Sequence, residues 1–313
     1  MMWPWRRGER EPGWLAISIE PGALSFAHGR RGANGKPAIG RCGTRALEGE
    51  FGGADRIARE LHFDRFRCST LLAPGEYQML VVEAPNVPPA ELKTAVRWRV
   101  KDLLDYHLDD ATIDVLDIPP ESPEGGRAHS MYAVAARNDV IQGRIGRFDA
   151  ARIPLSVIET ADTAQRNIAA LFEPQDRGVA LLHFNPGHGL LTINFRGELY
   201  LSRRIDAGMD QLLAAPGPAR DEAMSRVALE LQRTFDHFDR QFRFVAVAKL
   251  LVGPEPADSG IVAHLASNLD VPVEPLRLQE ALSFGAEASL DREGEWRLFH
   301  LIGAALRGEE KAL

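Results

Sequence analysis

Two glycine-bearing turns, each set between short apolar runs, are the places where residue types and spacing in this chain could support chemistry. The clearer one is Asn185-Pro186-Gly187-His188-Gly189. Backbone N–H groups can close on a phosphate only where side chains are absent, so such a turn can cradle an anion. A glycine pair at a hairpin is more often only a turn. From these residues alone, the turn could be a nucleotide site, the remnant of such a site, or a hairpin turn without a binding function.

Strand-type segments must position these turns. Three short runs rich in β-branched and aromatic residues follow Gly178, which predicts an antiparallel meander with turns at 185–189 and 196–197. Near the start, Trp14–Ile19 and Ala23–His28 predict a second hairpin about a turn at Gly22. Because strand, glycine turn and strand occur twice, the sequence suggests two related lobes. The runs of the meander are 179–184, 190–195 and 198–204.

The rest of the chain alternates strands with amphipathic helices, which predicts a mixed α/β fold. Apolar residues recur every three or four positions from Ala90 to about His107, which predicts one helix with Trp98 off its apolar stripe. A longer helix is expected from Asp221 to about Phe242. The glycine-rich stretch 30–53 is expected to be mostly loop with a possible edge strand. Tyr77–Glu83 is expected to be an edge strand paired in a hairpin with 68–73.

Composition excludes several classes of protein. A length of 313 residues suits two lobes, and a net charge of −7 argues against a nucleic-acid-binding protein. No apolar run reaches the roughly 18 residues that span a bilayer. Cys42 and Cys68 lack metal-ligand spacing, and His183 and His188 lack a third ligand, so no metal site is expected. These features predict a soluble cytoplasmic protein whose two cysteines are reduced.

The first ten residues, MMWPWRRGER, concentrate tryptophan and arginine. A flexible basic and aromatic start over residues 1–13 is the simpler interpretation, because one such cluster binds membranes only marginally. Peripheral contact with lipid headgroups is the alternative. It would use Trp3, Trp5, Arg6 and Arg7.

Four strings resemble the MshI and PilM family, the cytoplasmic actin-like components of type IV pilus machinery. They are VPPAELKTAVRW at 87–98, YAVAARNDV at 132–140, GELYLSRRI at 197–205 and LIGAALR at 301–307. The resemblance extends over residues 14–307, and AVRWRVKDLLDYHLDD is most similar to the MshI branch of mannose-sensitive haemagglutinin (MSHA) pili.

The resemblance implies a two-lobed actin-like (ribonuclease H-like) ATPase fold, an α/β fold with mixed sheets flanked by helices and a small inserted subdomain. The expected boundaries are 14–172 for the first lobe, about 40–136 for the inserted subdomain and 173–313 for the second lobe. The implied partner is the N-terminal cytoplasmic tail of a PilN-like bitopic inner-membrane protein, which would hold this chain at the membrane.

The resemblance also implies a cleft for ATP, with an Asp-x-Gly-x-Ser type phosphate loop in each lobe, and here the chain departs from the family. Ser18 and His183 stand at the acidic positions, and Glu20 stands where a glycine is expected. A magnesium ion bound to phosphates is usually coordinated by carboxylate oxygens, which Ser18 and His183 do not supply. The negative charge of Glu20 would repel a triphosphate. Neither ATP hydrolysis nor a cofactor is expected, with residual ATP binding as the alternative. The nucleotide-binding remnant comprises Ser18, Glu20, Gly22, His183, Asn185, Gly187, Gly189, Gly208 and Gly253.

The predicted function is therefore a non-catalytic scaffold, with an ATP-binding switch or weak ATPase as the main alternative. A sugar kinase of the same superfamily would need a catalytic aspartate, for which Asp206 is the candidate, although a helix N-cap explains that residue more simply. The expected partner contacts, by groove binding or strand addition, are Tyr77, Arg97, Trp98 and Lys101.

Overall fold

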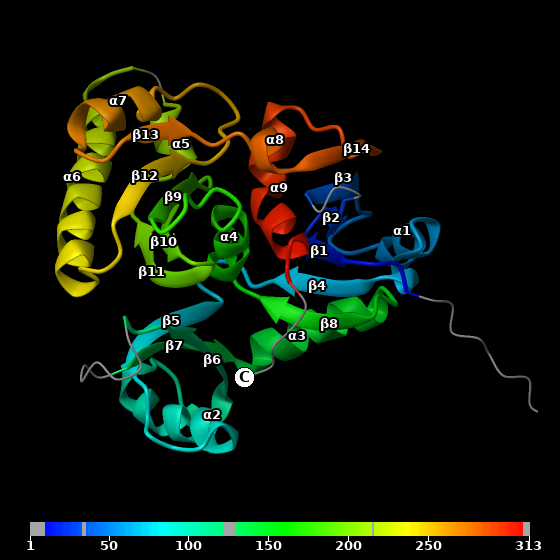
Figure 1. The fold of residues 1–313 in the computed structure, drawn as a ribbon. Helices are drawn as coiled ribbons and strands as arrows, with labels where there is room; N and C mark the ends of the chain where they lie inside the picture. Colours follow the sequence, from blue (N-terminus) through cyan, green and yellow to red (C-terminus); the bar gives the residue numbers. More distant parts are fainter. Residues whose placement is uncertain (1–9, 33–35, 122–128, 215, 309–313) are drawn as a thin grey trace, which may run out of the picture.

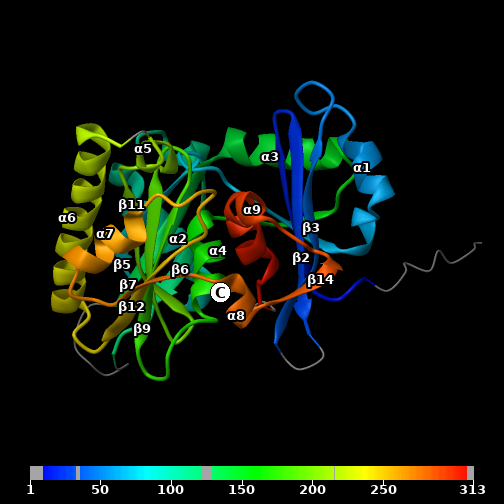
Figure 2. The same ribbon diagram turned by 90° about the horizontal axis from the view of Figure 1, so that it is seen from above.

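The computed structural model describes residues 10–32, 36–121, 129–214 and 216–308. Two large β-sheets face each other across a central pair of helices, and further helices cover the outer face of each sheet (Figures 1 and 2). The central helices are α4 (Ala161–Ala169) and α9 (Arg292–Ala305). The predicted two-lobed α/β architecture is confirmed.

The first lobe is built on a six-stranded sheet in the order β14-β3-β2-β1-β4-β8. Leu15, Ile17 and Ile19 face its outer helices, whereas Ala16 and Ala27 face α9. The strands are β1 (Trp14–Glu20), β2 (Ala23–Arg31), β3 (Pro37–Ala46), β4 (Arg67–Leu71), β8 (Leu155–Glu159) and β14 (Ser283–Glu287), and the outer helices are α1 (Ala54–Glu60) and α3 (Asn138–Ala150), with a 3-10 turn, η1, at Phe63–Arg65.

The second lobe is built on a five-stranded sheet in the order β11-β10-β9-β12-β13. The predicted meander forms its first three strands, and β13 forms the opposite edge of the sheet. The strands are β9 (Gly178–Phe184), β10 (Gly189–Phe195), β11 (Glu198–Ile205), β12 (Val247–Val252) and β13 (Val273–Pro275), and the helices are α5 (Met209–Leu212), α6 (Pro218–Gln241), α7 (Ile261–Asn268) and α8 (Leu278–Ala281).

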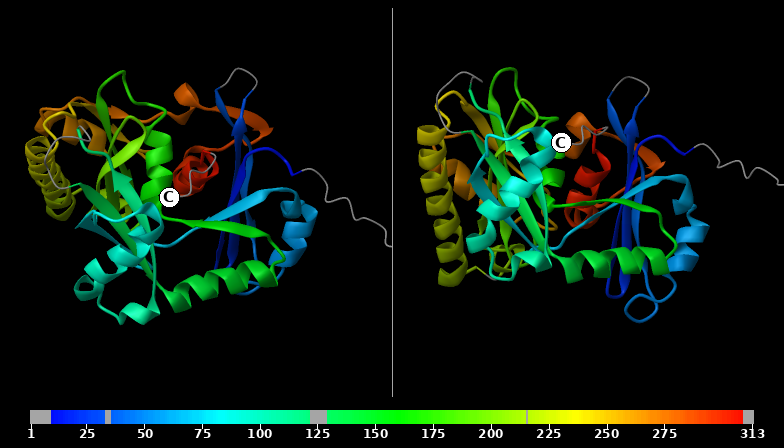
Figure 3. Two further views of the ribbon diagram at one scale, coloured as in Figure 1. Left: turned by 60° about the horizontal axis from the view of Figure 1, so that its bottom comes forward. Right: turned by 90° about the horizontal axis from the view of Figure 1, so that it is seen from below.

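A three-stranded sheet with the order β5-β7-β6 forms the inserted subdomain. Its helix α2 covers one face, and its other face packs on the second lobe through Ile118 and Tyr132. From this sheet α3 runs to the outer face of the first lobe (Figure 3). The elements are β5 (Tyr77–Glu83), α2 (Pro89–Arg99), the 3-10 turns η2 (Lys101–Leu103) and η3 (Leu108–Asp110), β6 (Ala111–Ile118) and β7 (Ser130–Arg137).

Two local predictions are wrong. The helix predicted over 90–107 ends at Arg99, and the chain then turns through η2 and η3. Leu103 is 53% exposed, because the apolar stripe stops facing the core after Val100. The stretch 30–53 is not mostly loop, since β3 occupies ten residues of it and pairs with strands on both sides.

The predicted boundaries also differ from the pairing of the strands. β4 pairs with β1 in the first sheet, whereas β5 lies in the inserted sheet, so the subdomain starts near Tyr77 rather than residue 40 and the hairpin of 68–73 with 77–83 does not form. β5 is nevertheless an edge strand, as predicted. At the other end, β14 pairs with β3 and α9 packs on β1 and β2. The last part of the predicted second lobe therefore returns to the first.

Gly303 permits the closest approach between the two central helices. A Cβ at this position would lie 2.2 Å from the backbone oxygen of Ala164 in α4, which no side chain tolerates. The Asn167 amide donates to the Gly303 carbonyl oxygen at 3.0 Å. The lobes are therefore joined through a backbone-to-backbone helix contact. Within the described residues, no helix combines the length and apolar character needed to cross a bilayer.

Candidate functional site

The first predicted phosphate loop is the turn that joins β1 to β2. Gly22 has a φ of 81°, the left-handed region that glycine adopts readily. Its N–H donates to the Glu50 carbonyl oxygen at 2.8 Å, and its own carbonyl accepts from the Leu47 N–H at 2.9 Å. The backbone donor that a phosphate would need at this position is therefore already used within the protein.

Glu20 is held by a buried arginine that the sequence did not single out. Arg144 of α3 is 2% exposed, and its guanidinium donates to Glu20 Oε1 at 2.7 Å and to Glu76 Oε2 at 2.6 Å. Ser18 Oγ also donates to Glu20 Oε1, at 3.3 Å. The predicted uncompensated repulsion at Glu20 is thus wrong, because an arginine neutralises this carboxylate.

Arg144 connects three segments that are distant in sequence: the end of β1, helix α3 and the turn before β5. Burial alone would lower the pKa of Arg144, but the hydrogen bonds that it donates to Glu20 and Glu76 raise it. The only sequence signal for this role is its place four residues before Phe148, on the buried stripe of α3. An anion entering this loop would have to compete with Glu20 for the guanidinium.

The second predicted phosphate loop, between β9 and β10, is closed on the segment that precedes α5. The Met209 N–H donates to the Asn185 carbonyl at 2.8 Å, and the Asp210 N–H donates to Pro186 at 3.1 Å. A Cβ at Gly208 would lie 2.0 Å from the Pro186 oxygen, so only glycine fits there. Gly187 faces open space, with nothing within 4 Å of its Cβ position. The loop is therefore held to this segment through its own carbonyl oxygens, which are not the groups that would bind a phosphate.

Gly189 and Asn185 also make internal contacts. A Cβ at Gly189 would meet the Phe184 ring at 3.0 Å. The Asn185 N–H donates to the His188 carbonyl at 2.8 Å, and the two side chains lie 3.3 Å apart. These residues shape a tight hairpin turn.

His183 lies behind this turn in a buried aromatic cluster between the lobes. It is 1% exposed, stacks on Phe299 with ring centroids 4.2 Å apart, and meets His300 edge-on at 5.0 Å. Burial lowers the pKa of His183 well below its usual value, and it lowers that of His300 to about 3. Both rings are therefore neutral near pH 7.

Gln165 of α4 anchors this cluster to the second sheet. Its amide nitrogen donates to the carbonyls of Leu181 and Leu190 at 2.8 and 3.0 Å, and its oxygen lies 3.2 Å from His300 Nε2. Gly253 packs against the other side of His183, since a Cβ there would lie 2.7 Å from Nδ1. Neutral side chains thus fill the position where an acidic magnesium-binding residue was expected.

Two buried glutamates were missed by the sequence reasoning. Glu159, at the end of β8, lies 3.3 Å from Arg307 Nη1, and burial raises its pKa. Glu255 follows Gly253, accepts from the Ser259 N–H at 3.1 Å and also has a pKa raised by burial. Both carboxyl groups are held by neighbouring residues, and neither lies in a motif that the sequence alone would reveal.

These residues do not fit a magnesium triphosphate as they are arranged. Ser18 and His183 supply no carboxylate, and the Gly22 N–H and the Arg144 guanidinium already have partners. Among the described side chains, no three of the His, Cys, Asp or Glu type come together as metal ligands. Asp206 is exposed, and Gly208 rather than Asp206 is the N-cap of α5, so its expected capping role is wrong.

Tyr77 does not offer its hydroxyl to a partner. It donates to Asp162 at the start of α4, and Ser202 of β11 donates to the other oxygen of the same carboxylate. Burial and the Asp162 charge raise the pKa of Tyr77. Asp162 therefore ties the inserted subdomain to both lobes. The Tyr77 hydroxyl has an internal role, and strand addition at the edge of β5 stays a prediction.

The other predicted partner residues differ in availability. Arg97 donates to the carbonyls of Leu108 and Ala111 at 2.6 and 2.9 Å, so it supports the turn before β6. Trp98 is 65% exposed, and Lys101 is exposed as well. Trp98 and Lys101 remain available to a partner. Trp3, Trp5, Arg6 and Arg7 lie outside the described residues.

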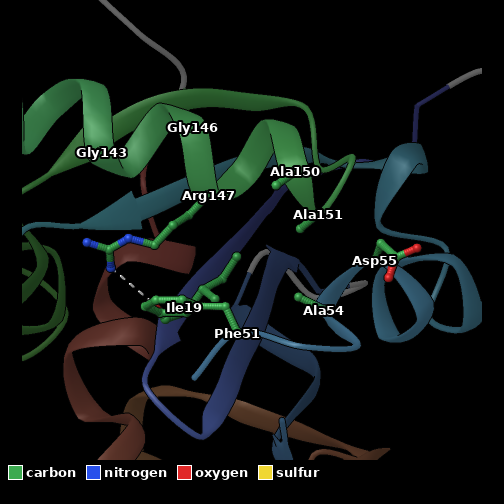
Figure 4. Close-up of a pocket in the computed structure, with 9 residues that line it drawn as sticks. All are labelled: Ile19, Phe51, Ala54, Asp55, Gly143, Gly146, Arg147, Ala150 and Ala151. Carbon is green, nitrogen blue, oxygen red and sulfur yellow. Dashed lines mark hydrogen bonds between the residues drawn. The ribbon is translucent and has the colours of Figure 1, made fainter. Parts of the chain in front are cut away.

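A groove in the first lobe, beside the first turn, was not anticipated. Its volume is about 370 Å³, and it lies between α3 and the segment Phe51–Asp55 (Figure 4). Arg147 borders one end, where its guanidinium donates to the Ile19 carbonyl at 3.3 Å, and Asp55 lies at the other. The wall on α3 is made of small residues: Gly143, Gly146, Ala150 and Ala151.

Comparisons with known proteins give similarity at the level of structure. No protein-family model matches the sequence, and no curated protein does. A chain of the PilM-PilN type IV pilus biogenesis complex matches over 96% of this chain and 99% of its own, with a TM-score of 0.69 and 19% identity.

Two other solved structures match more distantly. The cytoplasmic domain of EpsL, from the type II secretion system of Vibrio cholerae, covers 92% of this chain and 94% of its own, at 12% identity and a TM-score of 0.47. A Bacteroides thetaiotaomicron protein with an actin-like ATPase fold covers 90% and 96%, at 8% identity and a TM-score of 0.45. The chain has the two-lobed actin-like ATPase fold that its sequence predicts, in the form seen in the PilM-PilN complex.

Proposed function

We propose that this chain is a non-catalytic cytoplasmic scaffold of a type IV pilus assembly machine, of the MSHA type. It would bind the N-terminal cytoplasmic tail of a PilN-like bitopic inner-membrane protein and so be held at the membrane through that partner. The observation that carries the proposal is the match over 96% of the chain to a chain of the PilM-PilN complex. The internal use of the Gly22 N–H and of the Arg144 guanidinium supports a role without catalysis.

The groove beside α3 suits an extended peptide tail. Its volume of about 370 Å³ lies in the range of ~300–1,000 Å³ typical of ligand sites. Gly143 and Gly146 leave open space along the helix, and Phe51 offers a half-exposed ring over which Arg147 lies at 5.2 Å. Apolar side chains of the tail would fill the groove, and a tail carboxylate could pair with Arg147. The exposed surface around Trp98 on α2 is the alternative binding site for the tail.

Filling this groove is expected to abolish capture of the tail. In a calorimetric titration with the synthetic tail peptide, the natural chain should bind with a Kd of tens of micromolar or tighter. Gly146→Leu should weaken binding at least tenfold, because its side chain would occupy the groove without meeting any atom within 4 Å of Cβ. The helix itself should be no less stable, since leucine is a better helix former than glycine.

Gln142→Leu is the matched control, because it adds the same side chain to an exposed position of α3 that does not line the groove. It should leave the affinity unchanged. If Trp98→Ala weakens capture and Gly146→Leu does not, the tail lies on α2 instead. Absence of binding by the natural chain at tens of micromolar would count against the scaffold function itself.

An ATP-binding switch is the second candidate, and two observations favour it. Gly187 is exposed and unobstructed, and Glu20 is 47% exposed, so it could turn away and free Arg144 for a phosphate. Calorimetry with magnesium ATP should show no binding tighter than about 1 mM by the natural chain. A micromolar Kd would favour the switch. Glu20→Gly should then tighten binding further, because it removes the carboxylate that competes for Arg144.

A further inference from the structure

The free edge of the inserted sheet is a strand with no protection against pairing. β5 is seven residues long and pairs with β7 over its whole length without a bulge. Its middle, Met79-Leu80-Val81, is apolar, and Val81 is 54% exposed. The strand contains neither proline nor lysine, and its one charged residue, Glu83, is the last. β5 therefore lacks the devices with which proteins usually prevent an edge strand from pairing with another chain.

The other sheet edges are short, interrupted or covered. β13 has three residues and ends in Pro275. β8 and β14 have five residues each, and the pairing of both strands contains a register shift. β6 and β11, the remaining edges, lie against each other. Of the sheet edges in the described residues, β5 alone is long, regular and apolar.

The hydrogen-bonding groups on the free edge of β5 have a defined phase. The Ala84 N–H donates to the His129 carbonyl at 2.7 Å, so these two residues form a hydrogen-bonded pair just beyond the strands. Because such pairs alternate with non-hydrogen-bonded pairs along an antiparallel ladder, Met79 and Val81 direct their N–H and C=O groups away from β7. Elsewhere in the described chain, no residue makes a hydrogen bond to these groups. The edge thus presents unpaired donors and acceptors at alternate positions.

The strand is complementary to a second copy of itself. A two-fold axis at Leu80 would place Met79 opposite Val81 of the second copy, with the outward groups of both residues in phase for hydrogen bonds. The exposed side chain of Val81 would be covered by Met79 of the second copy, and the two Leu80 side chains would meet on the other face. Glu83 would lie opposite Tyr77 at each end, so the two carboxylates would be kept apart.

We propose that β5 pairs antiparallel with β5 of a second copy of this chain, about a two-fold axis at Leu80, and so forms a dimer with one continuous sheet. The contact is confined to the strands and their immediate neighbours, so the dimer should be reversible, with a Kd of about 10–100 μM. β5 does not line the groove beside α3, so self-association and capture of the tail in that groove use different surfaces.

Sedimentation velocity of the full chain at about 5 to 500 μM tests the dimer. Val81→Pro should weaken self-association about tenfold or more, because proline removes an N–H that points away from β7 and leaves the ladder with β7 intact. Val81→Lys should also weaken it, through a charge on the edge and without a change in the backbone. The matched control is Leu229→Lys, at a leucine of α6 that is 46% exposed, and it should leave self-association unchanged.

A single introduced cysteine tests the register. The Cα atoms of a non-hydrogen-bonded pair lie about 4.5 Å apart, within the range of a disulfide, so Leu80→Cys should give a disulfide-linked dimer under mild oxidation. Gln78→Cys is the matched control on the same face of β5. It would lie opposite Val82 of the second copy and should not cross-link. The natural chain, with half-buried Cys42 and buried Cys68, gives the background.

Three results would overturn the proposal. They are a monomer at every concentration, a dimer that Val81→Pro does not weaken, and equal cross-linking of the Leu80→Cys and Gln78→Cys variants. If the chain stays monomeric and Val81→Pro instead abolishes binding of the tail peptide, β5 binds the tail and not a second copy. Self-association is measured without the tail peptide, so its failure and that of the scaffold function are distinguishable.

Discussion

Replacing Arg144 with methionine is expected to lower the free energy of unfolding by about 2–4 kcal/mol. Arg144 is 2% exposed and donates to Glu20 and Glu76 at 2.7 and 2.6 Å, so its loss leaves two carboxylates without their cation. Breaking a fully buried pair costs roughly 3–5 kcal/mol. The expected value is smaller because Glu20 is 47% exposed and can regain water. Chemical denaturation measures the change directly.

Arg147→Met is the control for the Arg144 prediction, since it removes the same group one turn further along α3. Arg147 makes a single 3.3 Å hydrogen bond to Ile19 and a contact with the Phe51 ring, so a loss below about 1 kcal/mol is expected. Adding Glu20→Gln and Glu76→Gln to Arg144→Met should recover part of the stability, because the uncompensated charges are gone. Equal losses for Arg144→Met and Arg147→Met would show that the ion pairs do not stabilise the loop.

Acidification from pH 7 to pH 5 is expected to destabilise the fold by about 2 kcal/mol through His300, and the lowered pKa of His183 acts in the same direction. The folded-state pKa of both groups lies below the unfolded value of 6.5, and that of His300 is about 3. The unfolded chain therefore binds more protons below pH 6.5. The stabilisation is complete above pH 6.5 and is lost progressively as the pH falls toward 3.

His300→Gln isolates this contribution, because glutamine can still donate to Gln165 but cannot be protonated. Its loss of stability between pH 7 and 5 should be about 2 kcal/mol smaller than that of the natural chain. The raised pKa values of Glu159 and Glu255 have the opposite effect, because these groups stabilise the fold as the pH falls. Both glutamates are present in the natural chain and in the variant, so their contributions cancel when the two losses of stability are compared. The same loss of stability in the natural chain and in the His300→Gln variant would contradict the assignment.

Local patterns predicted the core of the fold because it is encoded by short-range periodicity. The hairpin about Gly22, the meander of β9 to β11 and the long helix α6 follow directly from alternation, turn residues and helical spacing. The patterns failed where pairing is non-local. β3 carries glycines that weaken any local strand signal, yet it forms because β2 and β14 offer hydrogen bonds on both sides.

The departures at Ser18, Glu20 and His183 could be read directly from the sequence, but the groups that act on them could not. Arg144 lies 124 residues from Glu20, and Phe299 and His300 come from the last helix to pack on His183. No local rule gives such contacts, because they depend on how α3 and α9 lie against the sheets. Tyr77 shows the same limit, since its position on an edge strand suggested a partner but Asp162 takes its hydroxyl.

By itself, the sequence determined the two-lobed α/β plan, and it gave Ser18 and His183 rather than carboxylates in the two predicted phosphate loops, because side-chain type and spacing can be read along one chain. Only the tertiary structure decided that Glu20 is neutralised and that the N–H of Gly22 is already used. The reason is physical: charge compensation and donor satisfaction are properties of groups brought together in space by the packing of distant segments.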